Sequence, residues 1–532
     1  MILLIFPPFA MPDKPYISLP TLAAHLLHHQ VPVALWDANL EFFRQVMAPG
    51  ALLERLENHE GAGSIRDLFS DPDLSNRERL RLFGAYLPLV NGPGERERLG
   101  MTGNTGYLRY QGPGCLFSSG DLIRHARTPD SLTRRTCRNG LNALLGREHP
   151  DLVGISVAFP DQIQSALTLA AMVKEIDPGL PVVLGGPFVT LYMENCRNSE
   201  LFSLVDYLAL GDGETILTRL YAHLKTKGRN ATGKADVPGV VFHDPAAGIV
   251  RTGAPLVFPM AASKAPAYGL LPLDRYLVPR RSGAVLFRLS RGCYWARCAF
   301  CNSCSPVING HDRQDAAVLH GQLMRTLAET GRRIVHFTDD AADPELLLDI
   351  ANRLFEEKQD LNWTVNVRVD RRLTLETLFL LRKAGCFSLF LGIESCSNRV
   401  LGLMNKGTTF RMIHQVLSNL SWAGINANIY MIVGFPTETE TEARSSFEKV
   451  KEWIDAGLVN QVVYNLFSIP AQSPVARSPD RYGITAIDPT VGDLAPPGQF
   501  FQCRSGMTRE TAARLFGEFT RTLKTRHGQT IL

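Results

Sequence analysis

The sequence predicts an α/β protein in which a doubly wound parallel sheet is followed by a partial (β/α)6 barrel and a small C-terminal helical tail. Short apolar strands alternate with helical segments along most of the 532 residues, and this alternation is typical of parallel sheets covered by helices. The chain is also too long for one hydrophobic core, because single cores stop growing at about 250–300 residues. We therefore expect the two sheets to form separate domains.

The N-terminal part, residues 1–230, predicts a Rossmann-like sheet. Its strands are continuous apolar runs, and helical patterns such as 162–176 lie between them, which indicates strands buried on both faces. We expect strands at residues 2–6, 32–39, 152–159, 181–190 and 205–214.

Two successive strands of this sheet run into glycines: Gly185 and Gly186 in one case, Gly211 and Gly213 in the other. Isolated glycines commonly make tight turns and nothing more. Sheets of this kind also bind ligands just beyond the carboxyl ends of their strands. Both interpretations stay open, and the repetition favours a ligand site.

Two segments interrupt the regular pattern. Residues 44–148 are Arg-rich and much longer than a crossover between parallel strands needs, so they are expected to be an insertion that covers a ligand or contacts a substrate. Residues 231–280 are predicted to be a linker with a hairpin at 238–253.

A second alternating series follows over residues 281–475. Helices lie between the strands; one begins with Asp343 as N-cap and Pro344 in its first turn. The spacing predicts a partial TIM-like barrel, whose chemistry belongs at the carboxyl ends of its strands. Residues 476–532 form a C-terminal extension with a helix at 508–524. The six strands are expected at residues 284–290, 333–340, 363–370, 387–395, 426–436 and 461–470.

Composition narrows the setting. The net charge of +4 is small for this length, so nothing in it points to a nucleic-acid partner or a membrane surface. No apolar stretch reaches the roughly 18 residues of a membrane span. The ten cysteines are mostly isolated, which suits a reducing compartment and predicts a cytoplasmic protein.

Four cysteines cluster on one loop. Cys293, Cys298 and Cys301 form a C-x4-C-x2-C pattern, and Cys304 follows three residues later. Three thiolates on an iron–sulfur cluster leave one iron open for a reactant. A structural zinc with Cys304 as its fourth ligand is the alternative, although such sites usually join two separated ligand pairs. Disulfides are disfavoured by the compartment.

The loop 293-CYWARCAFC-301 resembles a variant of the radical S-adenosylmethionine (SAM) signature, whose usual form is C-x3-C-x2-C; Phe300 before the last cysteine is kept. Cobalamin-binding members of that superfamily carry similar segments to several found here, and their N-terminal domain is similar to residues 1–230. The similar segments are 337-FTDD-340, 392-GIES-395, 434-GFPTET-439 and 468-SIPAQSP-474.

The resemblance implies a [4Fe-4S] cluster on Cys293, Cys298 and Cys301, with SAM on the fourth iron. Two further sets of residues are implied as cofactor-binding. The set for SAM is Glu394, Gly434, Phe435 and Pro436, and the set for cobalamin is Ser156, Gly185, Gly186, Pro187, Gly211, Gly213 and Glu214.

Some residues near these segments carry alternatives. Asp339 and Asp340 belong to the barrel rim, where one of them could cap the next helix. Arg368 either neutralises a carboxylate or makes an ordinary ion pair. Many cobalamin domains present a histidine from a D-x-H-x-x-G loop, but residues 7–18 contain none. We therefore expect no protein histidine on cobalt.

The resemblance implies a cobalamin-dependent radical methylase that acts on an unactivated carbon. A radical cyclase or rearrangement enzyme would use the same cofactors, and a structural metal-binding module is the non-enzymatic alternative. An electron donor such as flavodoxin or ferredoxin is implied as a partner, and the substrate is a small molecule, a lipid or a peptide. A methylthiotransferase is disfavoured because Cys115, Cys137 and Cys196 are too scattered for a second cysteine triad.

Overall fold

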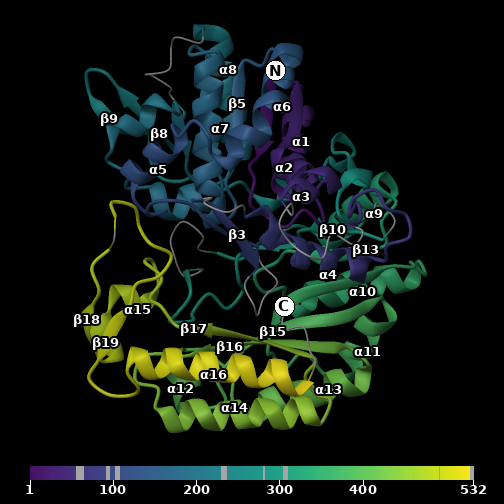
Figure 1. Ribbon diagram of the computed structural model, residues 1–532. Coiled ribbons are helices and arrows are strands. Elements are labelled where there is room, and N and C mark those ends of the chain that lie inside the picture. Colours follow the sequence, from purple (N-terminus) through teal and green to yellow (C-terminus); the bar gives the residue numbers. More distant parts are fainter. Residues whose placement is uncertain are drawn as a thin grey trace.

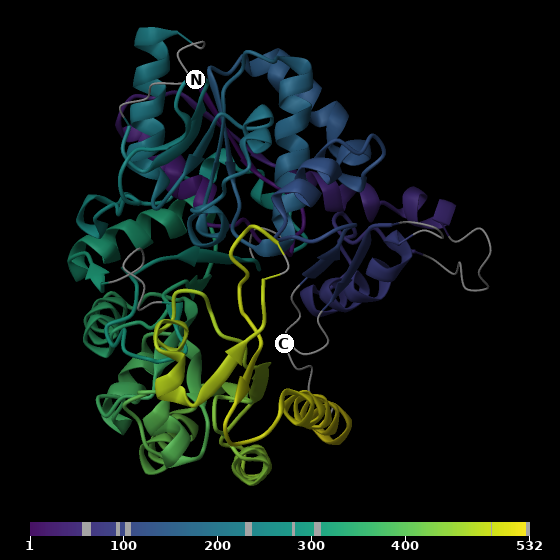
Figure 2. The ribbon, with the colours of Figure 1, turned by 90° about the vertical axis from the view of Figure 1, so that its left-hand side faces the viewer.

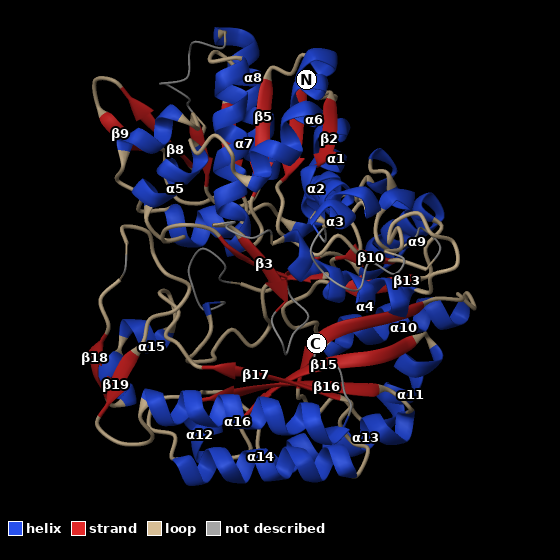
Figure 3. Cartoon of the chain, viewed as in Figure 1, coloured by secondary structure: helices blue, strands red, loops and turns tan. Residues whose placement is uncertain are grey.

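Two parallel sheets dominate the computed structural model (Figures 1 and 3). The structure describes residues 1–55, 65–91, 96–101, 108–228, 237–278, 282–302, 310–490 and 492–527. The first sheet has the order β2-β1-β5-β6-β7-β8-β9 and the second the order β10-β13-β14-β15-β16-β17. The predicted α/β class with parallel sheets is confirmed.

The first sheet contains five parallel strands and a two-stranded antiparallel edge. Its parallel strands are ordered second, first, third, fourth, fifth along the chain, so the direction of winding reverses between β1 and β5, and ligands bind at such a reversal. The strands are β1 (Ile2–Phe6), β2 (Val33–Asp37), β5 (Leu152–Ser156), β6 (Val182–Gly185), β7 (Tyr207–Ala209), β8 (Val240–Asp244) and β9 (Gly248–Arg251).

Alternate side chains of β1 enter two different cores, which is why this sheet has helices on both faces. Leu3 and Ile5 belong to one core, and Ile2, Leu4 and Phe6 belong to the other. The first core is covered by α2 (Ala38–Val46), α5 (Ser119–Ala126), α6 (Leu132–Glu148) and α7 (Ile163–Ile176), and the second by α1 (Ser18–His28) and α8 (Gly213–Lys227).

Two boundary expectations need correction. Residues 44–148 include α6, which packs against α2 and α7 as part of the helical layer, so the inserted part is shorter than expected. It contains α3 (Pro49–Arg55), α4 (Asn76–Tyr86) and the hairpin of β3 (Arg98–Met101) and β4 (Leu108–Gln111). The hairpin expected inside the 231–280 linker exists as β8–β9, but it extends the first sheet because β8 pairs with β7.

The second sheet has six parallel strands in chain order, each overlapping a predicted strand. Figure 1 shows α13, α14 and α16 on its face away from the N-terminal half. Its closure into a partial barrel stays a prediction. The strands are β10 (Ala284–Phe287), β13 (Ile334–Phe337), β14 (Asn362–Arg368), β15 (Cys386–Glu394), β16 (Asn426–Val433) and β17 (Gln461–Leu466).

The helices of this half share one core with the sheet. Asp343 caps α10 as predicted, since its carboxylate accepts a hydrogen bond from the Glu345 amide at 3.1 Å. The helices are α9 (Ala316–Thr330), α10 (Pro344–Glu356), α11 (Leu375–Lys383), α12 (Asn398–Leu403), α13 (Phe410–Ala423), α14 (Glu440–Asp455) and α16 (Arg509–His527).

The C-terminal extension contains more than the expected helix. Besides α16, it holds the end of α15 (Pro474–Arg477) and a hairpin of β18 (Ile484–Ile487) and β19 (Phe501–Cys503). The connection of this hairpin reaches the N-terminal half (Figure 2). Within the described residues, no helix is both long and apolar enough to cross a membrane.

Candidate active site

The cysteine loop begins where β10 ends. Cys298 is buried, whereas Cys293 and Cys301 are half-buried. Cys293 forms a bridge with Ala341, which follows the neighbouring strand β13. Cys304 lies outside the described residues. The three cysteines therefore lie at the carboxyl edge of the second sheet, where the sequence predicted them.

A buried carboxylate holds the base of this loop. Asp339 accepts hydrogen bonds from the Leu289 amide at 3.1 Å, the Ser290 amide at 2.6 Å and the Ser290 hydroxyl at 2.5 Å. Burial raises the pKa of Asp339 to about 6, and the three hydrogen bonds oppose that rise. The expectation that Asp339 or Asp340 could cap the next helix is wrong, because Asp343 is the N-cap of α10.

The outer part of the loop docks on residues 404–407. The Ala299 amide donates to the Met404 carbonyl at 2.8 Å, and the Trp295 indole donates to the Asn405 carbonyl at 2.9 Å. Gly407 has φ +71°, and a Cβ there would collide with the Trp295 ring. This contact was not predicted, because it joins segments about 110 residues apart in the chain.

Charged side chains surround Cys298. Glu394 and Lys406 are buried and form an ion pair at 2.9 Å. The Lys406 ammonium lies 5.4 Å from the centroid of the Phe300 ring. The Arg368 guanidinium lies 3.5 Å from the Cys298 sulfur, and burial raises the pKa of the Cys298 thiol while Lys406 and Arg368 oppose the rise. The predicted Glu394 therefore lies close to the cysteines, and Lys406 was missed.

The 434–438 turn after β16 is held by its own buried carboxylate. Glu438 accepts a hydrogen bond from the Gly434 amide at 2.7 Å, and burial raises the pKa of Glu438 to about 8. Phe435 is buried, with its ring centroid 5.1 Å from that of Phe467. Any contact of Phe435 with a cofactor must therefore use its backbone, and Pro436 follows in the same turn.

The glycines of the first sheet lie close to the protein's own backbone. Gly186 has φ +102°, and a Cβ there would lie 2.6 Å from the Val157 carbonyl oxygen. Gly185 pairs with Ser156 on β5, and Pro187 follows. Packing within the sheet edge is thus sufficient to require glycine here, and the predicted cobalamin contacts of these residues stay a prediction.

The turn after β7 has similar structural partners. Gly211, with φ +91°, forms a bridge with Leu256, and a Cβ on Gly211 would collide with the Leu256 backbone. Gly213 is the first residue of α8, and Glu214 is buried, which raises its pKa. Their predicted role in cobalamin binding also stays a prediction.

Two polar residues at the β1/β5 reversal were missed by the sequence analysis. The Gln162 side chain accepts from the Ala158 and Phe159 amides at 3.0 and 3.1 Å and donates to the Pro7 carbonyl at 2.7 Å. Ser165 donates to the Pro8 carbonyl at 3.0 Å. The side chains of Gln162 and Ser165 therefore connect the loops after β1 and β5. A Q-x-x-S pattern at the start of a helix does not by itself predict such contacts.

An ion pair connects the two edges. Arg291, two residues before Cys293, lies 2.8 Å from the Asp212 carboxylate in the turn after β7. Asp212 also accepts a hydrogen bond from the Phe258 amide at 2.6 Å. The carboxyl edge of the first sheet is therefore attached directly to the base of the cysteine loop.

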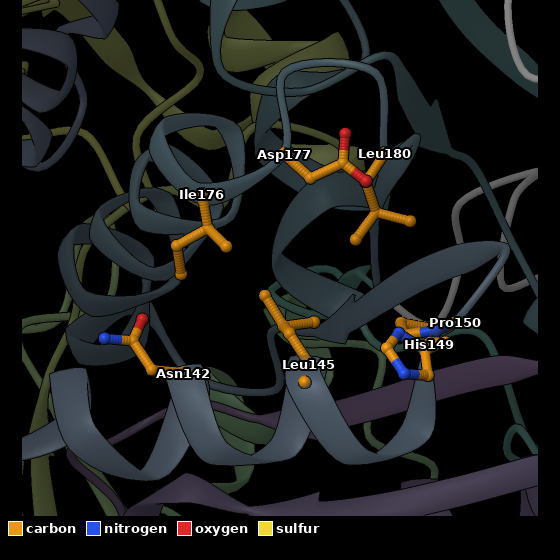
Figure 4. Close-up of a pocket in the computed structure, with 8 residues that line it drawn as sticks. Asn142, Leu145, His149, Pro150, Ile176, Asp177 and Leu180 are labelled. Atoms are coloured by element: carbon orange, nitrogen blue, oxygen red, sulfur yellow. The ribbon is translucent and has the colours of Figure 1, made fainter.

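A pocket of about 330 Å³ lies elsewhere (Figure 4). It is formed where α6 and α7 end, just before β5 and β6 begin, so it lies at the opposite edge of the first sheet. It takes no part in the candidate site. Its lining residues are Asn142, Leu145, Gly146, His149, Pro150, Ile176, Asp177 and Leu180.

Two domain families match the chain. Residues 287–450 match the Radical SAM superfamily, and residues 140–221 match the B12 binding domain. This chain is a radical SAM enzyme with a B12-binding domain. A radical SAM domain implies a [4Fe-4S] cluster and SAM, and a B12-binding domain implies cobalamin.

Two relatives match this radical SAM enzyme over similar lengths. The uncharacterized methyltransferase PH0819 of Pyrococcus horikoshii is 27% identical over 336 residues, 61% of this chain and 69% of that protein. The anaerobic magnesium-protoporphyrin IX monomethyl ester cyclase of Rubrivivax gelatinosus is 23% identical over 339 residues, 63% of this chain and 60% of that protein.

Two solved structures share the fold of this radical SAM enzyme. TsrM, a radical SAM methyltransferase of Kitasatospora setae solved with cobalamin and a [4Fe-4S] cluster, is 18% identical with a TM-score of 0.54; the match covers 89% of this chain and 73% of TsrM. The cobalamin-dependent SAM radical enzyme OxsB is 15% identical with a TM-score of 0.61, over 99% of this chain and 67% of OxsB.

The residues present in this radical SAM enzyme fit a cluster. Three thiols stand on one loop, and the cations Arg368 and Lys406 lie beside Cys298, which suits an anionic group held by thiolates. Within the part of the chain that the structure describes, no three His, Cys, Asp or Glu side chains are grouped so that they could hold a metal ion. A cluster distributes its thiolate ligands over different irons, so this observation concerns a single ion.

Proposed function

We propose that this radical SAM enzyme uses cobalamin to methylate an unactivated carbon of its substrate. The observation that carries the proposal is the Arg291–Asp212 ion pair, because it attaches the base of the cysteine loop to the edge of the B12-binding sheet. The similarity to the methyltransferase PH0819 supports the same reaction class.

When bound, the cluster and SAM supply a radical that removes hydrogen from carbon, and cobalamin supplies the methyl group. Cys293, Cys298 and Cys301 would hold the cluster, and Glu394 with the 434–436 turn would hold SAM. The protein's own contribution is to fix these groups and to keep water away from them. Asp339 and residues 404–407 do this for the cysteine loop through the hydrogen bonds described above.

The proposed roles divide along the chain. Residues 1–230 with the β8–β9 edge would bind cobalamin, residues 281–475 would bind the cluster and SAM, and residues 476–532 would complete the substrate site. The substrate is a small molecule, a lipid or a peptide, and flavodoxin or ferredoxin would supply the electron.

A radical cyclase is the second candidate, since the magnesium-protoporphyrin cyclase is 23% identical over 63% of this chain. The alternative of a purely structural metal-binding module is set aside, because the chain carries the radical SAM domain.

Methyl-labelled SAM tests the proposal. Reconstituted enzyme with a low-potential reductant and its substrate should transfer the label to a carbon and form both S-adenosylhomocysteine and 5′-deoxyadenosine, since one SAM supplies the methyl group and another the radical. Mass spectrometry of the products measures all three. A substrate converted with 5′-deoxyadenosine but without S-adenosylhomocysteine or label would contradict methylation and favour the cyclase.

A further inference from the structure

Arg368 is a buried cation at the end of β14, and its guanidinium is fixed on three sides. One nitrogen lies 3.5 Å from the Cys298 sulfur, and the other donates to the Lys406 carbonyl. The guanidinium carbon lies 4.6 Å from the centroid of the Trp295 ring. Because Trp295 and Lys406 also hold the cysteine loop, Arg368 is positioned by the same contacts as the cysteines.

Among the described residues, no carboxylate forms an ion pair with the Arg368 guanidinium. The neighbouring Glu394 pairs with Lys406 at 2.9 Å instead. A guanidinium stays protonated in proteins, and a buried charge without an opposite charge is strongly unfavourable. Of the three groups that contact the guanidinium, only the Cys298 sulfur can carry a negative charge, and a thiolate there would balance that of Arg368.

We propose that Arg368 is a positioning residue that tunes the [4Fe-4S] cluster, by donating an N–H···S hydrogen bond to the Cys298 thiolate and placing a fixed positive charge beside it. The inference rests on the cluster assignment but not on methyl transfer. Hydrogen bonds to cysteine sulfurs and net local charge both set cluster potentials. Since reduction adds a negative charge, Arg368 favours the reduced cluster that cleaves SAM.

The test compares redox titrations of reconstituted protein without substrate, followed by electron paramagnetic resonance. Arg368→Gln removes the charge and should lower the ratio of reduced to oxidised cluster about tenfold at a fixed solution potential, which equals about 59 mV for one electron. Iron content should stay at that of the native protein, because the three cysteines remain.

Arg368→Lys is the second variant. It keeps the charge, but an ammonium lacks the planar fork that reaches both the Cys298 sulfur and the Lys406 carbonyl, so the ratio should fall about threefold. Arg372→Gln is the matched control: Arg372 pairs with Asp370 at 2.9 Å and stacks on Tyr294, near the loop but not on a sulfur. It should change the ratio less than twofold.

An Arg368→Gln protein with full iron content and an unchanged potential would overturn the inference. If Arg368→Gln binds no iron, the test rests on Arg368→Lys. An unchanged cluster potential in Arg368→Lys would also overturn the inference. Native protein that binds no iron would overturn the cluster assignment as well. A failure of methyl transfer with the expected potential shifts would count against the proposed function alone.

Discussion

At the scale of single residues, buried carboxylates shape the backbone of the site. Asp339 binds the amides at the base of the cysteine loop, and Glu438 binds the Gly434 amide in the turn after β16. Both side chains are about 1% exposed, and burial raises both pKa values. Each carboxylate accepts hydrogen bonds from buried backbone amides of a turn, which would otherwise lack a partner.

Comparison of Glu438→Gln with the native protein should show that the burial of Glu438 makes the stability of the native protein depend on pH. The pKa of Glu438 is about 8 in the folded protein, raised from 4.5 by burial, so the folded state retains a proton that the unfolded state loses between those values. Stability therefore falls as pH rises through this window. Glutamine stays neutral and can still accept from Gly434. The melting temperature of the variant should exceed that of the native protein by a growing margin from pH 5 to pH 8, reaching a few degrees.

Glu442→Gln is the control for that prediction, because Glu442 and its partner Arg399 are the charged neighbours of Glu438. The hydrogen bond from Arg399 lowers the pKa of Glu442 to about 2, so the variant should melt below the native protein at pH 7. The difference should shrink as pH falls towards 2. Equal shifts of the same sign for both variants would contradict the assigned roles.

At the scale of elements, the C-terminal extension is attached to the N-terminal half by residues 492–495. Asp493 accepts from the Ser119 amide at 2.7 Å and from its hydroxyl at 2.6 Å. The Leu494 amide donates to the Phe117 carbonyl at 2.9 Å, and the Leu494 side chain is buried in the N-terminal core. The connection between β18 and β19 is thus a tertiary contact and not a loose loop (Figure 2).

Asp493→Ala should loosen this attachment. It removes an acceptor of two hydrogen bonds at the start of α5, and a lost charged hydrogen bond costs about 1.5–3 kcal/mol. Hydrogen exchange of residues 492–495 should accelerate about tenfold or more. Asp488→Ala is the control on the same connection, because its half-exposed carboxylate only faces Arg509 at 3.7 Å; comparable acceleration in both variants would contradict the role of Asp493.

At the scale of the whole molecule, contacts between the halves bring both predicted cofactor regions together. Besides Arg291–Asp212, the Tyr276 hydroxyl donates to Asp37 at 2.5 Å, and the Leu277 amide donates to the Pro12 carbonyl at 3.0 Å. The loop after β1 lies at the reversal of strand order in the first sheet. It is therefore bonded to the segment that leads into the second sheet.

Cobalamin bound at that reversal should have no protein histidine on cobalt, because residues 7–18 contain none. Reconstituted protein should bind about one hydroxocobalamin per chain. Electron paramagnetic resonance of the Co(II) form should lack nitrogen superhyperfine splitting from a protein ligand. Such splitting would contradict the prediction. Gly186 is unsuited as a probe, because a side chain there meets the Val157 backbone.

The local patterns of the chain are sufficient for much of the architecture. Segments of four to nine residues that are rich in apolar and β-branched residues, separated by helical periods, placed all six strands of the second sheet, because such residues suit a largely buried strand. The β18–β19 hairpin was missed since its strands are short and half exposed. The insertion was predicted to be too long because the sequence of α6 is mostly polar. Its buried residues form a narrow face that is recognised only from its packing against α2 and α7.

The two parallel sheets and the loop of three cysteines spaced for a cluster can be recognised from the sequence, because strand periodicity and ligand spacing are local properties. The surroundings of that loop cannot be recognised in this way. Arg368 and Lys406 come from other segments and reach Cys298 only in the folded chain. Asp339 reaches the base of the loop only when β10 and β13 align. The energy of a buried charge depends on its neighbours, because folding sets how far the charge is desolvated and which groups pair with it.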